Sequence, residues 1–355
     1  MLYQMIYALA ARDGREEALF GASAPLACKA FAQSLAGEEF PELWFEVPLA
    51  GEPWFDLHAL TSREGLSPDD VFTAERTGQN PDVFSWFAAQ RDGVRQLALS
   101  WDTGQGETEH PAVQLLVYKD CPELTCGFLE AAGRPDAMGA YRSFVNKLPK
   151  EWFACYAGVF PQRPGHNLRV ECIPSDGLQR AYAKDPALLE AHLRQVGIGE
   201  LAASADEESG AAASQPSSCS QAANTRMPST LGDTLLPRCQ LMANTPFRLE
   251  FQFDVDSNGR AGQTFGASLR FAKPPREGSW EAFLPDGPAG EFMREVEAWG
   301  LADGRWRKLA ETTFAKRVSH GGESRTLFCY PAFIKLRWRA GEPVDAKAYL
   351  IAGVQ

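Results

Sequence analysis

The sequence predicts an α+β fold: five β-hairpin-plus-helix repeats that close into a ten-stranded antiparallel barrel with the helices outside. Three observations predict it. Segments of alternating apolar and polar residues occur in pairs. The residues between the two members of each pair are typical of tight turns. Stretches with apolar residues three and four positions apart lie between the pairs. A doubly wound parallel sheet is excluded, because it needs single strands that alternate with helices.

The strand pairs are expected at 43–49 with 54–60, 94–101 with 112–118, 152–160 with 167–173, 247–255 with 263–271, and 333–339 with 346–354. Their connections carry turn residues, as in Ser257-Asn258-Gly259. Five hairpins give ten strands. Closure into a barrel removes both sheet edges and gives each strand one inward and one outward face.

The helices are expected at 25–36, 82–91, 136–147, 186–197 and 289–299. The fourth one shows the clearest boundaries. Asp185 can cap its first turn and Pro186 suits the first helical position. Gly197 follows its last turn, and Gly300 has the same place after the fifth helix, where glycine ends helices most readily.

The chain of 355 residues is 45% hydrophobic and 23% charged, so it can bury a large core. We expect one barrel domain over 1–355, because the repeat resumes after 200–235. That segment is rich in Ala, Ser, Gly and Gln, and we expect it to be a disordered insertion. The alternative is two open sheets in two domains, divided near the insertion.

The charge and the apolar pattern exclude several kinds of partner. Lysine and arginine total 35 against 46 acidic residues, and the formal charge of −11 argues against a nucleic-acid partner. The sequence contains no run of 18 apolar residues that would predict a membrane span. The N-terminus lacks the basic start of a signal peptide. The eight cysteines do not form the CxxC pairs of a structural zinc site, so we expect a cytoplasmic protein with reduced thiols. The oligomeric state stays open.

Strand alternation sorts the side chains into two faces. In the last hairpin, Ile334, Leu336 and Trp338 share one face, and Lys335 and Arg337 share the other. On an open sheet such a polar face is simply solvated. In a closed barrel it lines the interior, here called the lumen. The basic residues expected there could hold an anion such as a diphosphate, and they are Arg169, Arg270, Lys335, Arg337 and Lys347.

This repeat pattern resembles the aromatic prenyltransferases of the ABBA type, whose fold is called the PT barrel. The resemblance covers the architecture from about residue 40 to the C-terminus, and Lys347-Ala348-Tyr349 looks like the family's recurring Lys-x-Tyr. It implies that the five basic residues bind an isoprenoid diphosphate and that Glu46 takes a proton from the acceptor. It also implies that tyrosines shield the allylic cation, for which the candidates are Tyr118, Tyr156 and Tyr349.

The activity that the resemblance implies is transfer of an isoprenyl group from an allylic diphosphate to an aromatic small molecule or a peptide side chain. Neither a metal nor a cofactor is expected, because lysines and arginines can stabilise the leaving diphosphate. Consistently, the sequence contains no DDxxD motif. The alternative is a non-catalytic barrel that binds a peptide or an anionic ligand. That alternative gains if acidic neighbours such as Glu171, Glu250 and Asp254 already neutralise the inward charges.

Two further sequence patterns concern metal ions and acid–base chemistry. The five histidines do not pair at metal-ligand spacings, and only His58, which shares a face with Asp56, is considered for chemistry. The segment Asp254 to Gly259 superficially resembles a calcium loop, but the downstream glutamate is missing and a hairpin explains the turn.

Overall fold

The computed structural model describes residues 17–21, 42–62, 82–90, 93–102, 107–118, 121–161, 168–198, 235–271, 286–320, 323–339 and 342–354. Almost all of the insertion expected at 200–235 lies outside these residues, as does the helix expected at 25–36. Only Leu235 of that insertion is described, as the first residue of a helix.

Eleven strands are described in one antiparallel sheet. They are β1 (Glu42–Pro48), β2 (Asp56–Ser62), β3 (Val94–Asp102), β4 (Glu107–Val117), β5 (Trp152–Val159), β6 (Leu168–Pro174), β7 (Arg248–Val255), β8 (Ala261–Arg270), β9 (Phe314–His320), β10 (Glu323–Arg339) and β11 (Glu342–Val354). All five predicted hairpins are present, with boundaries that shift by a few residues, except that β10 begins ten residues earlier than expected.

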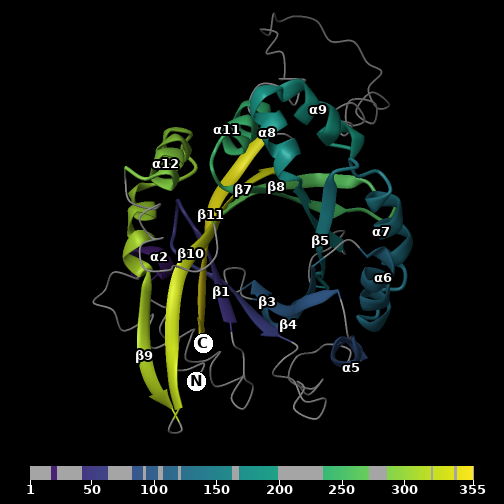
Figure 1. Cartoon of the computed structure of the whole chain (residues 1–355), viewed down its shortest axis with the longest axis horizontal. Helices are drawn as coiled ribbons and strands as arrows, with labels where there is room; N and C mark the ends of the chain where they lie inside the picture. Colours follow the sequence, from purple (N-terminus) through teal and green to yellow (C-terminus); the bar gives the residue numbers. More distant parts are fainter. Residues whose placement is uncertain are drawn as a thin grey trace, which may run out of the picture.

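The sheet closes on itself. Strands β1 to β8 follow one another around the ring, β8 pairs with β10, β10 with β11, and β11 with β1. The predicted ten-stranded barrel is therefore confirmed, and Figure 1 shows it end-on. The alternative of two open sheets is wrong, because β6 pairs directly with β7 across the insertion, with Arg169 opposite Asp254.

Helices surround the barrel on its outer side (Figure 1). They are α2 (Glu17–Phe20), α5 (Asp82–Ala89), α6 (Pro122–Ala131), α7 (Ala137–Val145), α8 (Asp176–Lys184), α9 (Pro186–Gln195), α11 (Leu235–Ala243) and α12 (Pro288–Ala298). The cap predicted for α9 is confirmed, since the Asp185 carboxylate accepts hydrogen bonds from the backbone N–H groups of Ala187 and Leu188. Gly197 and Gly300 adopt positive φ after α9 and α12, as predicted.

The sequence pattern missed several elements. Helices α2, α6, α8 and α11 were not predicted, and neither was β9, which pairs with the first residues of β10 from Glu323 to Cys329. Together β9 and β10 form a ribbon that extends beyond the ring of strands (Figure 1). Two short 3-10 helices, Gly304–Lys308 and Ala310–Thr312, lead from α12 into β9.

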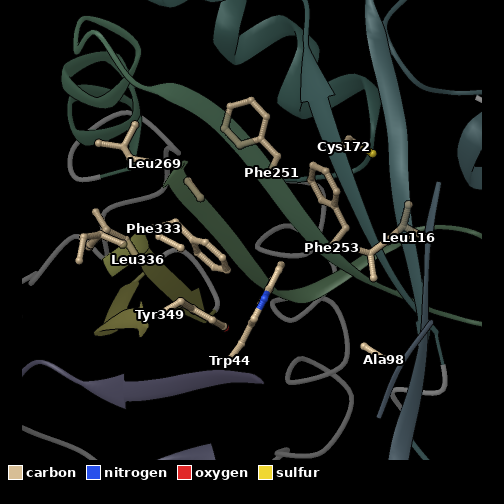
Figure 2. Close-up of a cluster of buried hydrophobic side chains, with 14 of the residues drawn as sticks. Trp44, Ala98, Leu116, Cys172, Phe251, Phe253, Leu269, Phe333, Leu336 and Tyr349 are labelled. Atoms are coloured by element: carbon tan, nitrogen blue, oxygen red, sulfur yellow. The ribbon is translucent and has the colours of Figure 1, made fainter. Parts of the chain in front are cut away.

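The main core lies between the barrel and the helices. Aromatic side chains on the outward face of the sheet stack there, and Phe251 and Phe253 are both shielded by Trp152, with ring centroids 4.9 and 5.9 Å away. Figure 2 shows Phe251, Phe253 and Leu269 on neighbouring strands of this cluster. This outward face is the one that alternation predicted to pack under helices. The opposite face is thereby left for the lumen.

The turn between β7 and β8 is a hairpin turn, as predicted. The Asp256 carboxylate accepts hydrogen bonds from the backbone N–H groups of Asn258 and Arg260, each at 2.9 Å. Gly259 has φ +69°, and a Cβ there would lie 2.6 Å from the carbonyl oxygen of Ala140. Only glycine fits this turn against α7. The local fold therefore accounts for the residues that resemble a calcium loop.

Candidate functional site

The barrel encloses a cavity of about 680 Å³. Its lining combines aromatic rings with charged side chains of both signs, contributed by strands from all around the ring. The volume lies within the range of small-molecule sites in proteins, which also pair apolar walls with a few polar groups. The lumen that strand alternation predicted is therefore an open cavity.

Glu46 on β1 lies at the centre of the best-connected polar cluster. Its Oε1 is 2.6 Å from the ammonium group of Lys347, and its Oε2 accepts a 2.5 Å hydrogen bond from the hydroxyl of Tyr349. Nε2 of His58 lies 3.4 Å from the same Oε2, while Nδ1 of His58 is 2.5 Å from the hydroxyl of Ser100. Strands β1, β2, β3 and β11 thus hold one carboxylate in a fixed orientation.

The charges around Glu46 set its ionisation. Burial alone would raise the pKa of Glu46, but the ammonium groups of Lys347 and Lys335 outweigh burial and hold this pKa well below its ordinary value. Burial, together with the Glu46 carboxylate, raises the pKa of Tyr349 well above its ordinary value, so the phenol stays a donor. The site therefore presents an ionised carboxylate with a neutral phenol beside it.

Lys335 on β10 differs from the other four predicted anion ligands, each of which lies within 4.0 Å of a carboxylate. Its ammonium group is 3.3 Å from the hydroxyl of Tyr349, and no described carboxylate lies within 4.0 Å of it. The side chain is only 3% exposed. Burial, together with the positive charges of Arg169 and Lys347, lowers the pKa of Lys335 to about 7 against the attraction of Glu46. An incoming anion would find here a cation whose charge is poorly compensated.

Aromatic rings form one wall of the cavity beside this cluster. Phe333 stacks on Tyr349 with ring centroids 4.0 Å apart, and Trp44 meets Phe333 edge-on at 5.4 Å. Figure 2 shows these three side chains next to one another. The guanidinium group of Arg270 lies 5.4 Å from the Phe333 centroid and 5.8 Å from that of Trp44. Such a wall suits a flat apolar ligand or a delocalised cation.

Three of the arginines predicted as anion ligands are paired with acids. Arg169 lies 2.7 Å from Asp254, Arg270 lies 2.7 Å from Glu250, and Arg337 makes two hydrogen bonds to Asp345. Three of the predicted anion ligands are thus already neutralised. This is the condition that favours the non-catalytic alternative, whereas the open cavity with its aromatic wall favours the enzyme.

The structure places most of the predicted site residues in the lumen. Glu46, Arg169, Arg270, Lys335, Tyr118, Tyr156 and Tyr349 line the cavity. Lys347 and Arg337 are not among the lining residues. Lys347 forms an ion pair with Glu46, and Arg337 forms one with Asp345. Tyr118 follows the end of β4 and is 69% exposed, which suits the mouth of the cavity better than a deep cation shield.

Several lining residues were not singled out from the sequence. Trp44 lies two residues before Glu46 on β1, and Phe333 lies two residues before Lys335 on β10, so each pair shares a strand face. Alternation could therefore have predicted that Trp44 and Phe333 face the lumen. Phe153 and Phe160 also line the cavity, but a register shift between Ala154 and Tyr156 changes the alternation within β5 and hides their direction.

The architecture, a closed ten-stranded antiparallel barrel with helices outside, resembles the PT barrel. No protein-family model and no curated protein sequence matches this chain. Among solved structures it is similar to a 6-dimethylallyl tryptophan synthase, at 12% sequence identity and a TM-score of 0.45, over 98% of this chain and 93% of that one.

Two further observations bear on the chemistry. Among the described residues no three His, Cys, Asp or Glu side chains gather in a way that could hold a metal ion. No helix in the described part of the chain is long and apolar enough to cross a membrane.

Proposed function

We propose that this barrel is a prenyltransferase that moves an isoprenyl group from an allylic diphosphate to an aromatic acceptor bound in the lumen, without a metal ion. The observation that carries the proposal is the ionised carboxylate of Glu46 beside the poorly compensated ammonium of Lys335, against the wall formed by Trp44, Phe333 and Tyr349. Such a reaction requires three elements: a carboxylate that accepts a proton, a cation that binds the diphosphate, and an aromatic wall.

The reaction uses each element in turn. The C–O bond of the allylic diphosphate breaks, and the diphosphate leaves with the bonding electrons toward Lys335. The rings of Tyr349 and Phe333 face the allylic cation and stabilise it through their π electrons. A carbon of the aromatic acceptor forms the new C–C bond, and the proton that this carbon loses passes to the ionised carboxylate of Glu46. A peptide carrying an aromatic side chain could serve as acceptor in the same way.

The second candidate is a non-catalytic barrel that binds a peptide or an anionic ligand. It is favoured by the pairing of Arg169, Arg270 and Arg337 with acids, because each of these guanidinium groups would have to leave or share its carboxylate to bind a diphosphate. The two candidates differ in what happens after the ligand enters: only the enzyme cleaves it.

Calorimetry with dimethylallyl and geranyl diphosphate, with and without magnesium, tests the proposal. Metal-independent micromolar binding that is lost in both Lys335→Ala and Lys347→Ala supports a diphosphate site in the lumen. Arg194→Ala, which alters an exposed ion pair on α9, is the matched control and should bind normally. Binding without consumption of the diphosphate in the presence of aromatic acceptors would favour the non-catalytic candidate. Absence of binding to either diphosphate would overturn the proposal.

A further inference from the structure

Three side chains outside the lumen form a continuous hydrogen-bonded chain between the barrel wall and two helices that cover it. The indole Nε1–H of Trp152 on β5 donates to the hydroxyl of Tyr182 on α8 at 2.7 Å. The same hydroxyl lies 2.7 Å from Nδ1 of His192 on α9. Tyr182 is 0% exposed, and Figure 1 shows α8 and α9 side by side outside the strands. One buried oxygen therefore joins a strand and two helices.

The chemistry of these three groups fixes the direction of each hydrogen bond. An indole N–H can only donate, so Tyr182 accepts from Trp152. In the described chain the only other partner of the Tyr182 hydroxyl is Nδ1 of His192, so the hydroxyl donates its own proton there. Nδ1 can accept only when the imidazole is neutral and carries its proton on Nε2. The arrangement therefore requires a neutral His192 in one defined tautomer.

Protonation of His192 would break this chain. Nδ1 would become a donor, so two N–H groups would point at the Tyr182 oxygen, and the hydroxyl proton would have no acceptor among the described residues. A buried donor without an acceptor is costly. Burial raises the pKa of Tyr182, so the phenol does not release that proton instead. Protonated His192 is therefore incompatible with its place against Tyr182.

Helix α8 also holds the edge of the cavity, through Gln179, which lies one helical turn before Tyr182 and is buried as well. The side-chain amide nitrogen of Gln179 donates to the carbonyl oxygen of Phe247 at 2.6 Å, and its amide oxygen accepts from the backbone N–H of Leu249 at 2.9 Å. Phe247 and Arg248 line the cavity, and Arg248 is exposed, so residues 247–249 lie where the cavity meets solvent. These three residues are here called the rim segment.

We propose that His192 is a proton-sensitive latch: neutral His192 holds α8 against the barrel wall, and protonated His192 releases α8 and, through Gln179, the rim segment. The latch goes beyond the proposed transfer reaction, since it controls the edge of the cavity whatever the cavity binds. The step conserves charge. One proton from solvent binds to Nδ1, and only hydrogen bonds are broken.

The groups around His192 determine how the latch depends on pH. Burial lowers the pKa of His192 from its ordinary value of 6.5, and the carboxylate of Glu151, just before β5, acts in the opposite direction. On α9 itself, Glu190 is paired with Arg194, and Arg238 on α11 stacks on an indole ring. The unfolded chain thus binds this proton at a higher pH than the folded chain. The contribution of His192 to stability is complete above pH 6.5 and is lost as the pH falls below that value.

NMR and hydrogen exchange on the full chain, without any ligand, test the latch. In ¹⁵N-histidine-labelled protein at pH 7.5, His192 should carry its proton on Nε2 and none on Nδ1, and His192→Asn identifies its resonances. The backbone N–H of Leu249 reports on the rim segment, because it donates to Gln179. Its protection factor, which corrects for the intrinsic exchange rate, should fall at least about tenfold between pH 7.5 and pH 5.

Variants separate the latch from its surroundings. In His192→Asn the side-chain oxygen can replace Nδ1 as an acceptor and does not titrate, so the fall in Leu249 protection should disappear. Tyr182→Phe removes the shared hydroxyl and should give low protection at both pH values. Glu190→Gln, which removes a titrating group on the exposed part of α9, is the matched control and should respond as the natural chain does.

Gln179→Leu tests the connection between the latch and the rim segment. It should leave Leu249 poorly protected at both pH values while His192 keeps its tautomer. An equal acid response in the natural chain and in His192→Asn would overturn the latch, as would a natural chain with the proton of His192 on Nδ1 at pH 7.5. Leu249 protection that does not change with pH would overturn release of the rim segment. None of these measurements uses an isoprenoid, so they stand or fall separately from the proposed function.

Discussion

Tyr349 donates a hydrogen bond to the carboxylate of Glu46 from a position 303 residues further along the chain. The two residues face one another across β11 and β1, the pair of strands that closes the ring. The candidate proton acceptor is therefore oriented by the same contact that completes the barrel. Local sequence around Glu46 cannot establish this geometry.

Tyr349→Phe should lower the free energy of unfolding by about 1–2 kcal/mol, because the buried Glu46 carboxylate keeps Lys347 but loses one hydrogen-bond donor. Isoprenyl transfer should slow as well, since Glu46 becomes less well oriented. Denaturant unfolding measures the first effect. Tyr118→Phe is the control: its ring is 69% exposed, so its unfolding curve should match that of the natural chain.

Diphosphate binding should weaken as the pH rises above about 7, because Lys335 loses its charge there. About one pH unit below that value the ammonium group is almost fully charged, and affinity should be at its plateau, apart from the titration of the diphosphate itself. Titrations with dimethylallyl diphosphate between pH 6 and 9 measure the effect. In Lys335→Arg the guanidinium stays charged, and the decline above pH 7 should disappear. An identical decline in both proteins would show that another group is responsible.

Lys335 should also make stability depend on pH. Its pKa is about 7 in the folded chain, against an ordinary value of 10.5, so the unfolded chain binds more protons between these limits. The free energy of unfolding should therefore rise with pH from about 7 to 10, relative to Lys335→Met, in which this contribution is absent. The difference between the two stability profiles isolates this lysine. A flat difference over that range would mean that its pKa is not lowered.

Arg169→Met should destabilise the barrel by about 3–5 kcal/mol, because it leaves the carboxylate of Asp254 buried without its guanidinium partner. Adding Asp254→Asn should restore much of the loss, since the amide carries no charge. Chemical denaturation of the two single variants and the double variant gives the coupling free energy. Additive losses would show that the pair does not stabilise the fold as a unit.

Gly353→Ala should be destabilising by about 1–3 kcal/mol, because a Cβ on Gly353 would lie 2.3 Å from Cζ of the Phe328 ring. Gly139→Ala on helix α7 provides the matched control. No described atom lies within 4 Å of a Cβ there, so alanine should stabilise the helix by about 0.5–1 kcal/mol. Thermal unfolding of both variants should thus shift in opposite directions. Equal shifts would contradict the close packing of Gly353.

Strand alternation was enough to predict the barrel and most of its inward residues, because a period of two fixes the face of each side chain once the pairing is known. Glu46, Arg169, Arg270, Lys335 and Tyr349 line the cavity for this reason. Their partners could not be predicted. The pairing of Arg337 with Asp345 depends on the register of β10 and β11, which shifts between Arg337 and Trp338.

Other elements were missed for local reasons. Helix α6 begins with Pro122 after Cys121 and contains polar residues on both faces, so its periodicity is weak. Strand β9, with the sequence FAKRVSH, pairs only with one end of β10 and lacks the long alternation of a strand inside the ring. Cys155 lies at a bulge, where one extra residue inverts the alternation and conceals the inward face.

The pairing of β1 with β11 has a consequence for how the chain acquires its structure. During synthesis β1 emerges before the ten other described strands and its partner β11 after them, so one edge of β1 stays open until the rest of the sheet has been made. Contacts between residues so distant along the chain form slowly, because the chain loses loop-closure entropy before these contacts stabilise the fold. Refolding should therefore be slow, and its intermediates should aggregate through that edge at high concentration.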